Sequence, residues 1–275
     1  MTKLAIIAGQ GALPGLLATA LNRQGNRDWL LVEMEGFAAD VPDMARLTFR
    51  VERLVPFMEE LEARGVGQVC FAGAVRRPRL EPELFDARTA QLVPRLIGAM
   101  GAGDDAALRA VIGLFEEFGF EVQGADQIAP DLVPQAGLLA GSPSDADRAD
   151  VARAAEIVAG LGPLDLGQGA VVAQGLCLAI ETLPGTDAML AFAALHADRL
   201  RPNPAGGRGV LFKAPKPGQD RRIDLPALGP DTVRAAAQAG LAGLAWPAGS
   251  VLLIDRDRMV AEAERLGLFL WSRPQ

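Results

Sequence analysis

Short apolar runs that alternate with amphipathic stretches are the feature that most constrains the fold of this 275-residue chain. In the first half, the runs LAIIAG, WLLVEM, LTFRV and QVCFAGAV are interrupted by stretches with helical spacing of apolar residues, at about 13–23 and 55–64. This rhythm is typical of βαβ units, in which a helix carries the chain from one parallel strand to the next. It predicts an α/β fold with an amino-terminal Rossmann-like domain built on a parallel sheet.

Two more helices, over 89–100 and 105–118, and a strand-like run, EVQGADQI, are expected before the middle of the chain. The run GSPSDAD near 141–147 indicates a linker, because Gly, Pro, Ser and Asp favour turns over regular structure. The sequence therefore predicts a first domain over residues 1–140, a linker over 141–148 and a second α/β domain over 149–275.

The second half begins again with the apolar run AVVAQGLCLAIE, followed by a helix over 186–197 and the strand GVLFKA. A helix over 231–240, a pair of strands, LAGLAW and SVLLID, joined by residues 247–249, and a last helix over 257–266 complete the expected elements. Their order leaves the topology of this second sheet open.

Composition excludes several classes of function. The mean hydropathy is +0.19, yet no apolar run approaches the roughly 20 residues that a membrane-spanning helix needs. A soluble protein is therefore expected. The start, MTKLAIIAGQG, has too short an apolar run for a secretory signal and indicates a first strand. A net charge of −7 argues against nucleic acid as a partner.

Histidine and cysteine are too scarce for many kinds of site. His196 is the only histidine, which excludes a multi-histidine metal site. Cys70 and Cys177 stand in apolar strand-like runs without a CxxC pair, so both are expected to be reduced core residues. The chemistry must then come from carboxylates, lysines, hydroxyls, backbone amides or a hard metal ion.

Two glycine-containing motifs follow predicted strands of the first domain. Gly9-Gln10-Gly11-Ala12-Leu13-Pro14 opens a helix, whose amino terminus attracts phosphate, but it lacks the third glycine of the dinucleotide fingerprint. Gly73-Ala74-Val75-Arg76-Arg77-Pro78 follows the strand QVCF. Ligands of open α/β sheets bind at the carboxyl ends of strands, so both motifs are candidate binding turns, and a tight turn without a ligand is the alternative for the first.

Two further motifs lead into helices. Gly101-Ala102-Gly103-Asp104-Asp105 could meet a sugar, a phosphate or a magnesium ion, although helix capping accounts for one of its aspartates. The run ETLPGTDAM, which contains Thr186 and Asp187, turns from an apolar strand into a helix. Asp187 there could equally be an ordinary acidic residue of a first helical turn.

The most densely charged motif is the segment KAPKPGQDRRIDLPAL, residues 213–228, which begins where the strand GVLF ends. Alternating cations and carboxylates at a strand end can hold an anionic group beside a metal ion or a water molecule. That is what the hydrolysis of a phosphoanhydride requires. A solvated loop is the alternative interpretation.

Together and in this order, the blocks IAGQGALP, AGAVRRP, GDDAALR, ETLPGTDAM and KPGQDRRIDLPALGPDTV resemble the UDP-2,3-diacylglucosamine diphosphatases of lipid A biosynthesis. The resemblance is to the two-domain type, which is unrelated to the calcineurin-like phosphoesterases, and it covers essentially the whole chain. The last block is the most specific, because no local folding rule demands its pattern.

The resemblance implies a pyrophosphatase that splits UDP-2,3-diacylglucosamine into UMP and 2,3-diacylglucosamine 1-phosphate (lipid X), with water attacking the β-phosphorus. It implies Mg²⁺, or Mn²⁺ in its place, and a cytoplasmic homodimer that can attach to the periphery of the inner membrane through its lipid substrate. The amino-terminal domain is then expected to bind UDP, and the second domain to bind the acylated sugar and carry the catalytic groups, with the active site between the two domains.

On this reading, the catalytic residues are expected to be Asp224, Asp220 and Lys213. Asp224 is the expected metal ligand or water-orienting carboxylate, with Asp220 in reserve, and Lys213 would neutralise phosphate charge. The residues expected to contact the substrate are Gly9, Gln10, Gly11, Leu13, Gly73, Val75, Arg77, Gly103, Asp104, Asp105, Thr186, Asp187, Gln219 and Arg222.

Two questions stay open. An acyl groove could involve the apolar residues Met189, Leu190, Phe192, Leu241 and Leu244, but for each of them an ordinary core position is favoured. The competing function is an NAD-dependent oxidoreductase or nucleotide-binding regulator, in which Gly9 and Gly11 cradle the dinucleotide and Glu33 or Glu35 binds its ribose. This alternative leaves the charged segment without a task.

Overall fold

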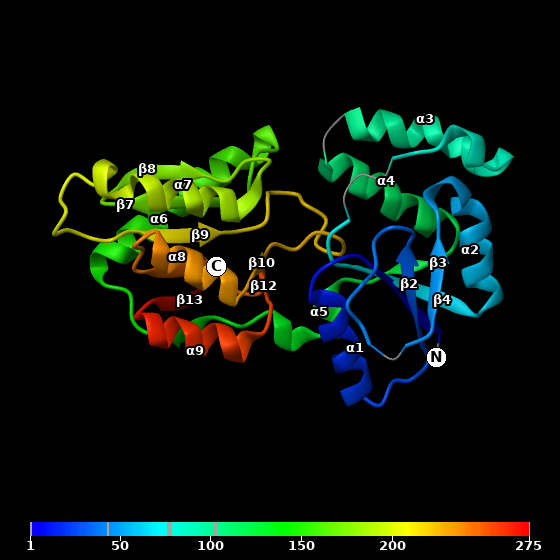
Figure 1. Cartoon of the computed structure of the whole chain (residues 1–275), viewed down its shortest axis with the longest axis horizontal. Coiled ribbons are helices and arrows are strands. Elements are labelled where there is room, and N and C mark those ends of the chain that lie inside the picture. Colours follow the sequence, from blue (N-terminus) through cyan, green and yellow to red (C-terminus); the bar gives the residue numbers. More distant parts are fainter. Residues whose placement is uncertain (1, 43, 76–78, 102–103, 275) are drawn as a thin grey trace. The chain divides into compact units, whose positions relative to one another are not determined.

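In the computed structural model of the protein, residues 2–42, 44–75, 79–101 and 104–274 are described. The chain divides into two compact units (Figure 1). The first unit comprises Met1–Pro130 and the short segment Asp220–Asp224, and the second comprises Asp131–Gln219 and Leu225–Gln275. A piece of the charged segment from the second half of the chain therefore belongs to the first unit.

The described part of the first unit contains a five-stranded parallel sheet with the order β3-β2-β1-β4-β5. Its strands are β1 (Lys3–Ala8), β2 (Trp29–Met34), β3 (Arg46–Phe49), β4 (Val66–Ala72) and β5 (Glu121–Val122). Its helices are α1 (Leu13–Arg23), α2 (Leu54–Ala63), α3 (Ala87–Gly101), α4 (Asp104–Glu117) and the short α5 (Ala125–Ile128). The Rossmann-like parallel sheet predicted from the sequence is confirmed.

Burial explains why the apolar runs of the first unit become parallel strands. In β1, every residue after Lys3 is buried, as expected for a strand covered on both faces. Helix α2 and the end of α4 pack on one side of the sheet through an aromatic cluster, in which Phe57 stacks on Phe49 at 4.1 Å and Phe115 meets Phe71 edge-on at 5.2 Å. The run EVQGADQI, expected as one strand, is the two-residue β5 followed by α5, because the Gln127 side chain accepts a hydrogen bond from the Gly124 amide and starts a helical turn.

The second unit contains a mixed sheet with the order β6-β13-β11-β9-β7-β8. Its strands are β6 (Gly137–Ala140), β7 (Gly169–Ala173), β8 (Leu176–Ile180), β9 (Val210–Lys213), β11 (Gly243–Pro247) and β13 (Phe269–Arg273). Strands β9, β11 and β13 are parallel, whereas β6 and β7 run antiparallel to their neighbours β13 and β9. A separate parallel pair joins β10 (Ala227–Leu228) to β12 (Leu252–Leu253). The second α/β domain is thereby confirmed.

Helices cover both faces of this sheet. They are α6 (Asp145–Leu161), α7 (Gly185–Leu200), α8 (Pro230–Gln238) and α9 (Arg256–Leu266). Alternate residues of β9 show the division: Leu211 packs in the cluster with α7, α8 and α9, whereas Val210 and Phe212 pack in the cluster with α6.

In the two units together, short 3₁₀ turns occur at Val51–Arg53, Pro82–Leu84, Pro130–Leu132 and Gly162–Leu164.

The structure differs from the sequence predictions in several elements of the second unit. LAGLAW and SVLLID do not pair with each other: β11 pairs with β9 and β13, and only Leu252–Leu253 of the second run is a strand, paired with β10. Strands β6 and β13 were not anticipated. The run GSPSDAD leads directly into α6, which begins at Asp145 within the run, and Ser144 and Asp147 form a capping box there. The chain has already entered the second unit at Asp131, ahead of the linker predicted at 141–148.

The two cysteines differ in environment. Cys70 is buried in β4, and burial raises the pKa of its thiol to about 12. Cys177 is exposed on the edge strand β8, so the prediction of a core position is wrong for this residue. Within the described residues, none of the helices has both the length and the apolar composition needed to cross a bilayer.

Candidate active site

The turns that follow β1 and β4 are joined by their backbones. The Gln10 amide donates to the Ala74 carbonyl at 2.9 Å, and the Ala74 amide donates back to the Gln10 carbonyl at 2.9 Å. A Cβ atom at Gly9 would lie 2.5 Å from the Ala74 oxygen, and one at Gly73, where φ is +91°, would lie 2.7 Å from the Gln10 oxygen. Glycine at these two positions is therefore required by the close approach of the two turns.

This joined pair of turns lies where the strand order of the first sheet reverses. The chain leaves β1 toward β2 on one side, and β4 lies on the other side of β1. Such a switch point at the carboxyl ends of strands is where open α/β sheets bind ligands. Among the predicted residues here, Gln10, Gly11 and Val75 are exposed, and Leu13, the first residue of α1, is half-buried. The structure thus brings the predicted residues of two separate motifs to one edge.

Three of the predicted residues lie wholly or partly beyond what is described. Arg77 and Gly103 lie outside the described residues. Asp104 begins α4, but its side chain is not described. Their assignments stay predictions.

Glu33, at the end of β2, has a structural task. Its carboxylate is buried, accepts the Ala39 amide at 2.8 Å and lies 3.5 Å from the Arg46 guanidinium. A carboxylate used in this way holds the loop after β2 and is not available to a ribose hydroxyl. The geometry therefore disfavours the dinucleotide-binding alternative with Glu33 as the ribose ligand.

The segment Asp220–Asp224 is tied into the first unit by Arg222. Its guanidinium donates to Asp220 through Nε at 3.0 Å and Nη2 at 2.7 Å, and to Glu116 of α4 through Nη1 at 2.6 Å. The Arg222 amide also donates to the Asp220 carboxylate, at 3.0 Å. Glu116 was not predicted from the sequence, because nothing in the spacing of residues 116 and 222 links them.

Electrostatics in this cluster follow from the same contacts. Hydrogen bonding to Arg222 is the main reason that the pKa of Asp220 lies below its ordinary value, and the positive charge of Arg109 contributes further. The pKa of Arg222 is raised in turn by Asp220 and Glu116. Asp105 pairs with Arg109 one helical turn away on α4. Asp105, Asp220 and Arg222, three predicted residues, therefore belong to one charged cluster of the first unit.

Asp224 ends the segment. Its amide donates to the Asp220 carbonyl at 3.4 Å, and the side chain is half-buried. The preceding residue, Ile223, packs against the apolar core of the first unit, and this packing holds the turn in place. The carboxylate predicted to be catalytic is thus carried on a turn that is anchored at both Arg222 and Ile223.

In the second unit, the structure brings Lys213 and Thr186 together. The Lys213 ammonium donates to the Thr186 hydroxyl at 2.6 Å, and both lie beside the carboxylate of Glu181. Asp187, the next residue of α7, is exposed. Glu181 stands in the predicted motif ETLPGTDAM but was not selected as a site residue.

Gln219, the last residue of the second unit before the inserted segment, holds the loop that follows β9. Its side-chain oxygen accepts the Gln168 side-chain amide and the Lys216 backbone amide, both at 2.9 Å. The predicted site residues of the charged segment are thus divided: Lys213 and Gln219 belong to the second unit, and Asp220, Arg222 and Asp224 belong to the first.

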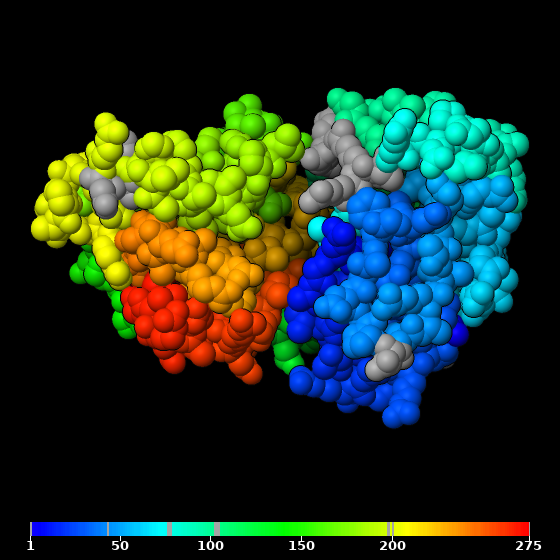
Figure 2. Space-filling model, viewed as in Figure 1, coloured from blue at the N-terminus to red at the C-terminus, as the bar shows by residue number. Residues whose placement is uncertain are grey.

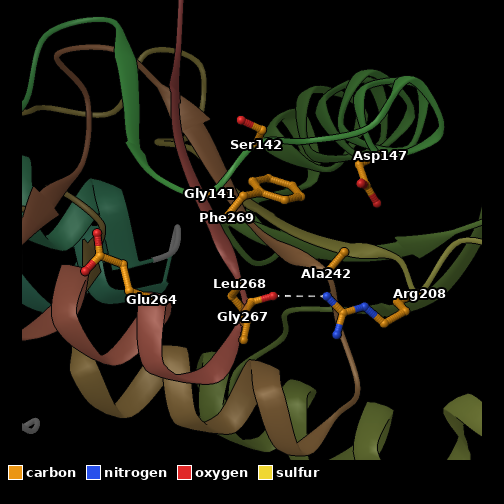
Figure 3. A pocket seen from close by; sticks show the side chains of 9 residues that line it. All are labelled: Gly141, Ser142, Asp147, Arg208, Ala242, Glu264, Gly267, Leu268 and Phe269. Atoms are coloured by element: carbon orange, nitrogen blue, oxygen red, sulfur yellow. Dashed lines mark hydrogen bonds between the residues drawn. The ribbon is translucent and has the colours of Figure 1, made fainter.

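A pocket of about 370 Å³ opens in the second unit (Figure 3). It is lined by Gly141, Ser142, Asp147, Arg208, Ala242, Glu264, Gly267, Leu268 and Phe269. Ala242 and Leu268 immediately precede β11 and β13, so the pocket lies at the amino ends of the parallel strands, whereas Lys213 ends β9. The Arg208 side chain donates to the Gly267 carbonyl at 3.2 Å, and these nine residues include none predicted for the site.

The apolar candidates for an acyl groove are mostly core. Met189, Leu190, Leu241 and Leu244 are at most 5% exposed, as the alternative interpretation expected. Phe192, by contrast, is 49% exposed on α7, which Figure 2 shows in yellow-green at the surface of the second unit.

Comparison with known proteins agrees with the two-unit organisation. Residues 3–132 match the LpxI N-terminal domain, and residues 134–271 match the LpxI C-terminal domain. The chain is 41% identical over 274 residues to the UDP-2,3-diacylglucosamine pyrophosphatase LpxI of Caulobacter vibrioides, covering 98% of this chain and 97% of that protein. The resemblance found in the sequence motifs is confirmed, and the chain belongs to the LpxI family of lipid A biosynthesis.

Proposed function

We propose that this chain hydrolyses UDP-2,3-diacylglucosamine to UMP and 2,3-diacylglucosamine 1-phosphate. The observation that carries the proposal is the 41% identity to the Caulobacter pyrophosphatase over 98% of the chain, which includes both domains and the charged segment. Hydrolysis of a diphosphate requires groups that neutralise its charge and a group that orients water. The contacts of Lys213, Asp224 and the glycine turns support the assignment of these tasks.

The first unit is proposed to bind the UDP portion. The turns after β1 and β4 lie at a strand switch point, and the turn after β1 leads into the start of α1, an arrangement suited to a diphosphate. The second unit is proposed to bind the acylated sugar and to supply Lys213. The Lys213 ammonium would neutralise charge on the phosphate that is attached to the sugar.

Asp224 is proposed to orient the attacking water or to hold the metal ion. Asp220 is the alternative, and its carboxylate accepts hydrogen bonds from the backbone and the guanidinium of Arg222. Direct binding of substrate by Arg222 requires a phosphate to compete with two carboxylates.

Magnesium, with manganese as a substitute, is the proposed metal ion. Among the described residues, three or more His, Cys, Asp or Glu side chains do not gather into a ready-made metal site. Mg²⁺ is commonly held by one or two carboxylates together with waters and substrate phosphates, and Asp224 fits that pattern. When bound, the ion would supply charge neutralisation at the phosphate oxygens.

We further propose that the enzyme is cytoplasmic and attaches to the periphery of the inner membrane through its lipid substrate. We also propose that it forms a homodimer. Phe192 and Leu195, 49% and 77% exposed on α7, are apolar side chains that either contact could cover. Sedimentation velocity should give twice the chain mass of 28.9 kDa, and the protein should sediment with vesicles only when they contain the substrate.

The proposed reaction is tested by release of UMP from UDP-diacylglucosamine in the presence of magnesium. Attack at the β-phosphorus predicts that hydrolysis in ¹⁸O-labelled water puts the label in the 1-phosphate of diacylglucosamine. Label in UMP would show attack at the α-phosphorus instead and would make Asp104 or Asp105 the leading candidates for orienting water. Binding of NAD with no release of UMP would contradict the proposed activity itself.

A further inference from the structure

Two buried charged groups and one half-buried hydroxyl form a chain of contacts at the end of strand β9 in the second sheet. The Lys213 Nζ donates to the Thr186 Oγ1 at 2.6 Å, and the Thr186 Oγ1 donates to the Glu181 Oε2 at 3.0 Å. The Lys213 Nζ lies 3.8 Å from the same Glu181 oxygen. Lys213 is 8% exposed and Glu181 is 9% exposed, so these contacts are largely shielded from solvent.

The three residues come from elements whose ends meet at this place. Lys213 ends β9, Glu181 directly follows β8, and Thr186 is the second residue of α7. The Glu181 amide donates to the Gly169 carbonyl at 2.8 Å, which fixes the end of β8 beside β7. A Cβ atom at Gly169 would lie 2.8 Å from the Glu181 Oε2, so glycine at this position leaves the space that the carboxylate occupies.

The direction of each hydrogen bond follows from the chemistry of the groups. An ammonium can only donate, and an ionised carboxylate can only accept. The Thr186 hydroxyl, which has a single proton, must therefore accept from Lys213 and donate to Glu181. Thr186 cannot offer that proton to a substrate phosphate while it bridges this pair, although the sequence predicted that it contacts substrate.

We infer that Glu181 and Thr186 are positioning residues that hold the ammonium of Lys213 in one orientation. Burying an ammonium is costly unless it is paired and hydrogen-bonded, and Glu181 supplies the countercharge. One hydrogen bond to Thr186 leaves the other N–H donors of the ammonium outside this contact. The inference rests on the proposed function, in which those donors face a phosphate of the substrate.

The first test compares Glu181→Gln with wild type in steady-state hydrolysis of UDP-diacylglucosamine. Gln can still accept the Thr186 proton but carries no charge, so kcat should fall at least about tenfold while KM changes less than about threefold. Thr186→Val should behave in the same way, and Thr186→Ser, which keeps the hydroxyl, should recover most of the loss. Wild-type kcat in Glu181→Gln would overturn the inference.

A matched control separates positioning from stability. Asp150 is also a buried carboxylate of the second unit and accepts the Gln174 and Gly175 amides at 2.9 and 2.7 Å. Asp150→Asn should lower the melting temperature without changing kcat below that temperature. An equal loss of kcat in Asp150→Asn would mean that any buried charge deletion in this unit impairs activity, and the inference would fail.

A double-mutant cycle asks whether Glu181 acts through Lys213. If it does, Glu181→Gln should cost less than about twofold in a Lys213→Met background, because the group that it orients is gone. The double variant should also melt higher than either single variant, since no buried charge is left unpaired. Additive losses of activity would show that Glu181 acts independently of Lys213.

A substrate-free measurement keeps this inference separate from the proposed function. In ¹⁵N-labelled protein, a side-chain ammonium gives a resolved signal when hydrogen bonds slow its exchange with water. Lys213 should give such a signal in wild type, identified by its loss in Lys213→Met, and Glu181→Gln should abolish it. If wild type releases no UMP but the signal behaves in this way, the proposed function fails and the positioning role stands; persistence of the signal in Glu181→Gln refutes that role.

Discussion

At the scale of single residues, Asp220 and Asp224 stand four positions apart in the same charged segment but have different surroundings. Asp220 is engaged by the amide and guanidinium of Arg222, whereas Asp224 is presented by the turn that this contact stabilises. The contacts of Asp220 give this carboxylate a structural role. Asp224 stays the carboxylate that is proposed to orient water or to hold the metal ion.

Replacement of Asp224 by Ala should accordingly lower kcat at least about a hundredfold, as is typical when a positioned acid-base group or metal ligand is lost. The melting temperature should change little, because the side chain is half-buried at the end of a turn. Comparison of UMP release by Asp224→Ala and Asp220→Ala checks this assignment. An inactive Asp220→Ala with an active Asp224→Ala would exchange the two roles.

The lowered pKa of Asp220 makes a contribution to stability that depends on pH. Hydrogen bonding to Arg222 favours the ionised carboxylate, so the contribution is complete above the ordinary pKa of 3.8 and is lost as the pH falls through the lower folded-state value. Asp220→Asn should destabilise the first unit by about 1 kcal/mol at pH 7, and the difference from wild type should narrow below pH 3.8. Denaturant titrations at several pH values measure it, and a difference that widened in acid would contradict the stated direction.

At the scale of elements, Arg222 links the inserted segment Asp220–Asp224 to α4 through its hydrogen bond to Glu116. Arg222→Met keeps the length and apolar character of the side chain but removes the hydrogen bonds to Asp220 and Glu116. Amide exchange at Ile223 and Asp224 should become faster, and kcat should fall about tenfold or more because Asp224 loses its fixed position.

Arg95→Met is the matched control for Arg222→Met. It breaks the exposed Arg95–Glu117 pair, 2.7 Å, between α3 and α4 of the same unit. An exposed pair of this kind contributes at most about 1 kcal/mol, and activity should stay unchanged. Equal loss of activity in both variants would point to a general effect on α4 in place of an effect on the inserted segment.

The joined turns after β1 and β4 give a second prediction at this scale. Gly73→Ala introduces a Cβ at φ +91° and 2.7 Å from a backbone oxygen, whereas Gly11→Ala introduces one at φ +96° into open space. The strain of a positive φ costs about 1–2 kcal/mol at either position, and the clash adds to it only at Gly73. Thermal unfolding should rank Gly73→Ala well below Gly11→Ala, and the reverse order would contradict this account of the turn.

At the scale of the whole molecule, the sequence contains a single histidine, which leaves oxygen as the ligand for the proposed metal ion. Magnesium or manganese should support hydrolysis, EDTA should abolish it, and zinc should not be the preferred ion. Assays after chelation and re-addition of each ion provide the measurement. Full activity after exhaustive chelation would remove the metal from the proposal.

The sequence by itself determined the parallel sheet of the first unit, the α/β class of the second and the family. A short apolar run such as LAIIAG that is followed by a helical stretch indicates a buried parallel strand. The family motifs are local blocks of sequence, so they are recognised without a structure. The sequence also predicted the two glycine-containing turns, because Gly9 and Gly73 each follow a strand directly.

Only the tertiary structure decided the contacts between residues far apart in the sequence. Strands β6 and β13 pair with each other although they lie near opposite ends of the sequence of the second unit. Arg222 binds Glu116, and the segment Asp220–Asp224 joins the first unit. The contacts among Lys213, Thr186 and Glu181 likewise depend on which strand ends are neighbours. Periodicity reports the face that a residue buries and not the partner that it meets, so such pairings follow from the packing of the whole chain.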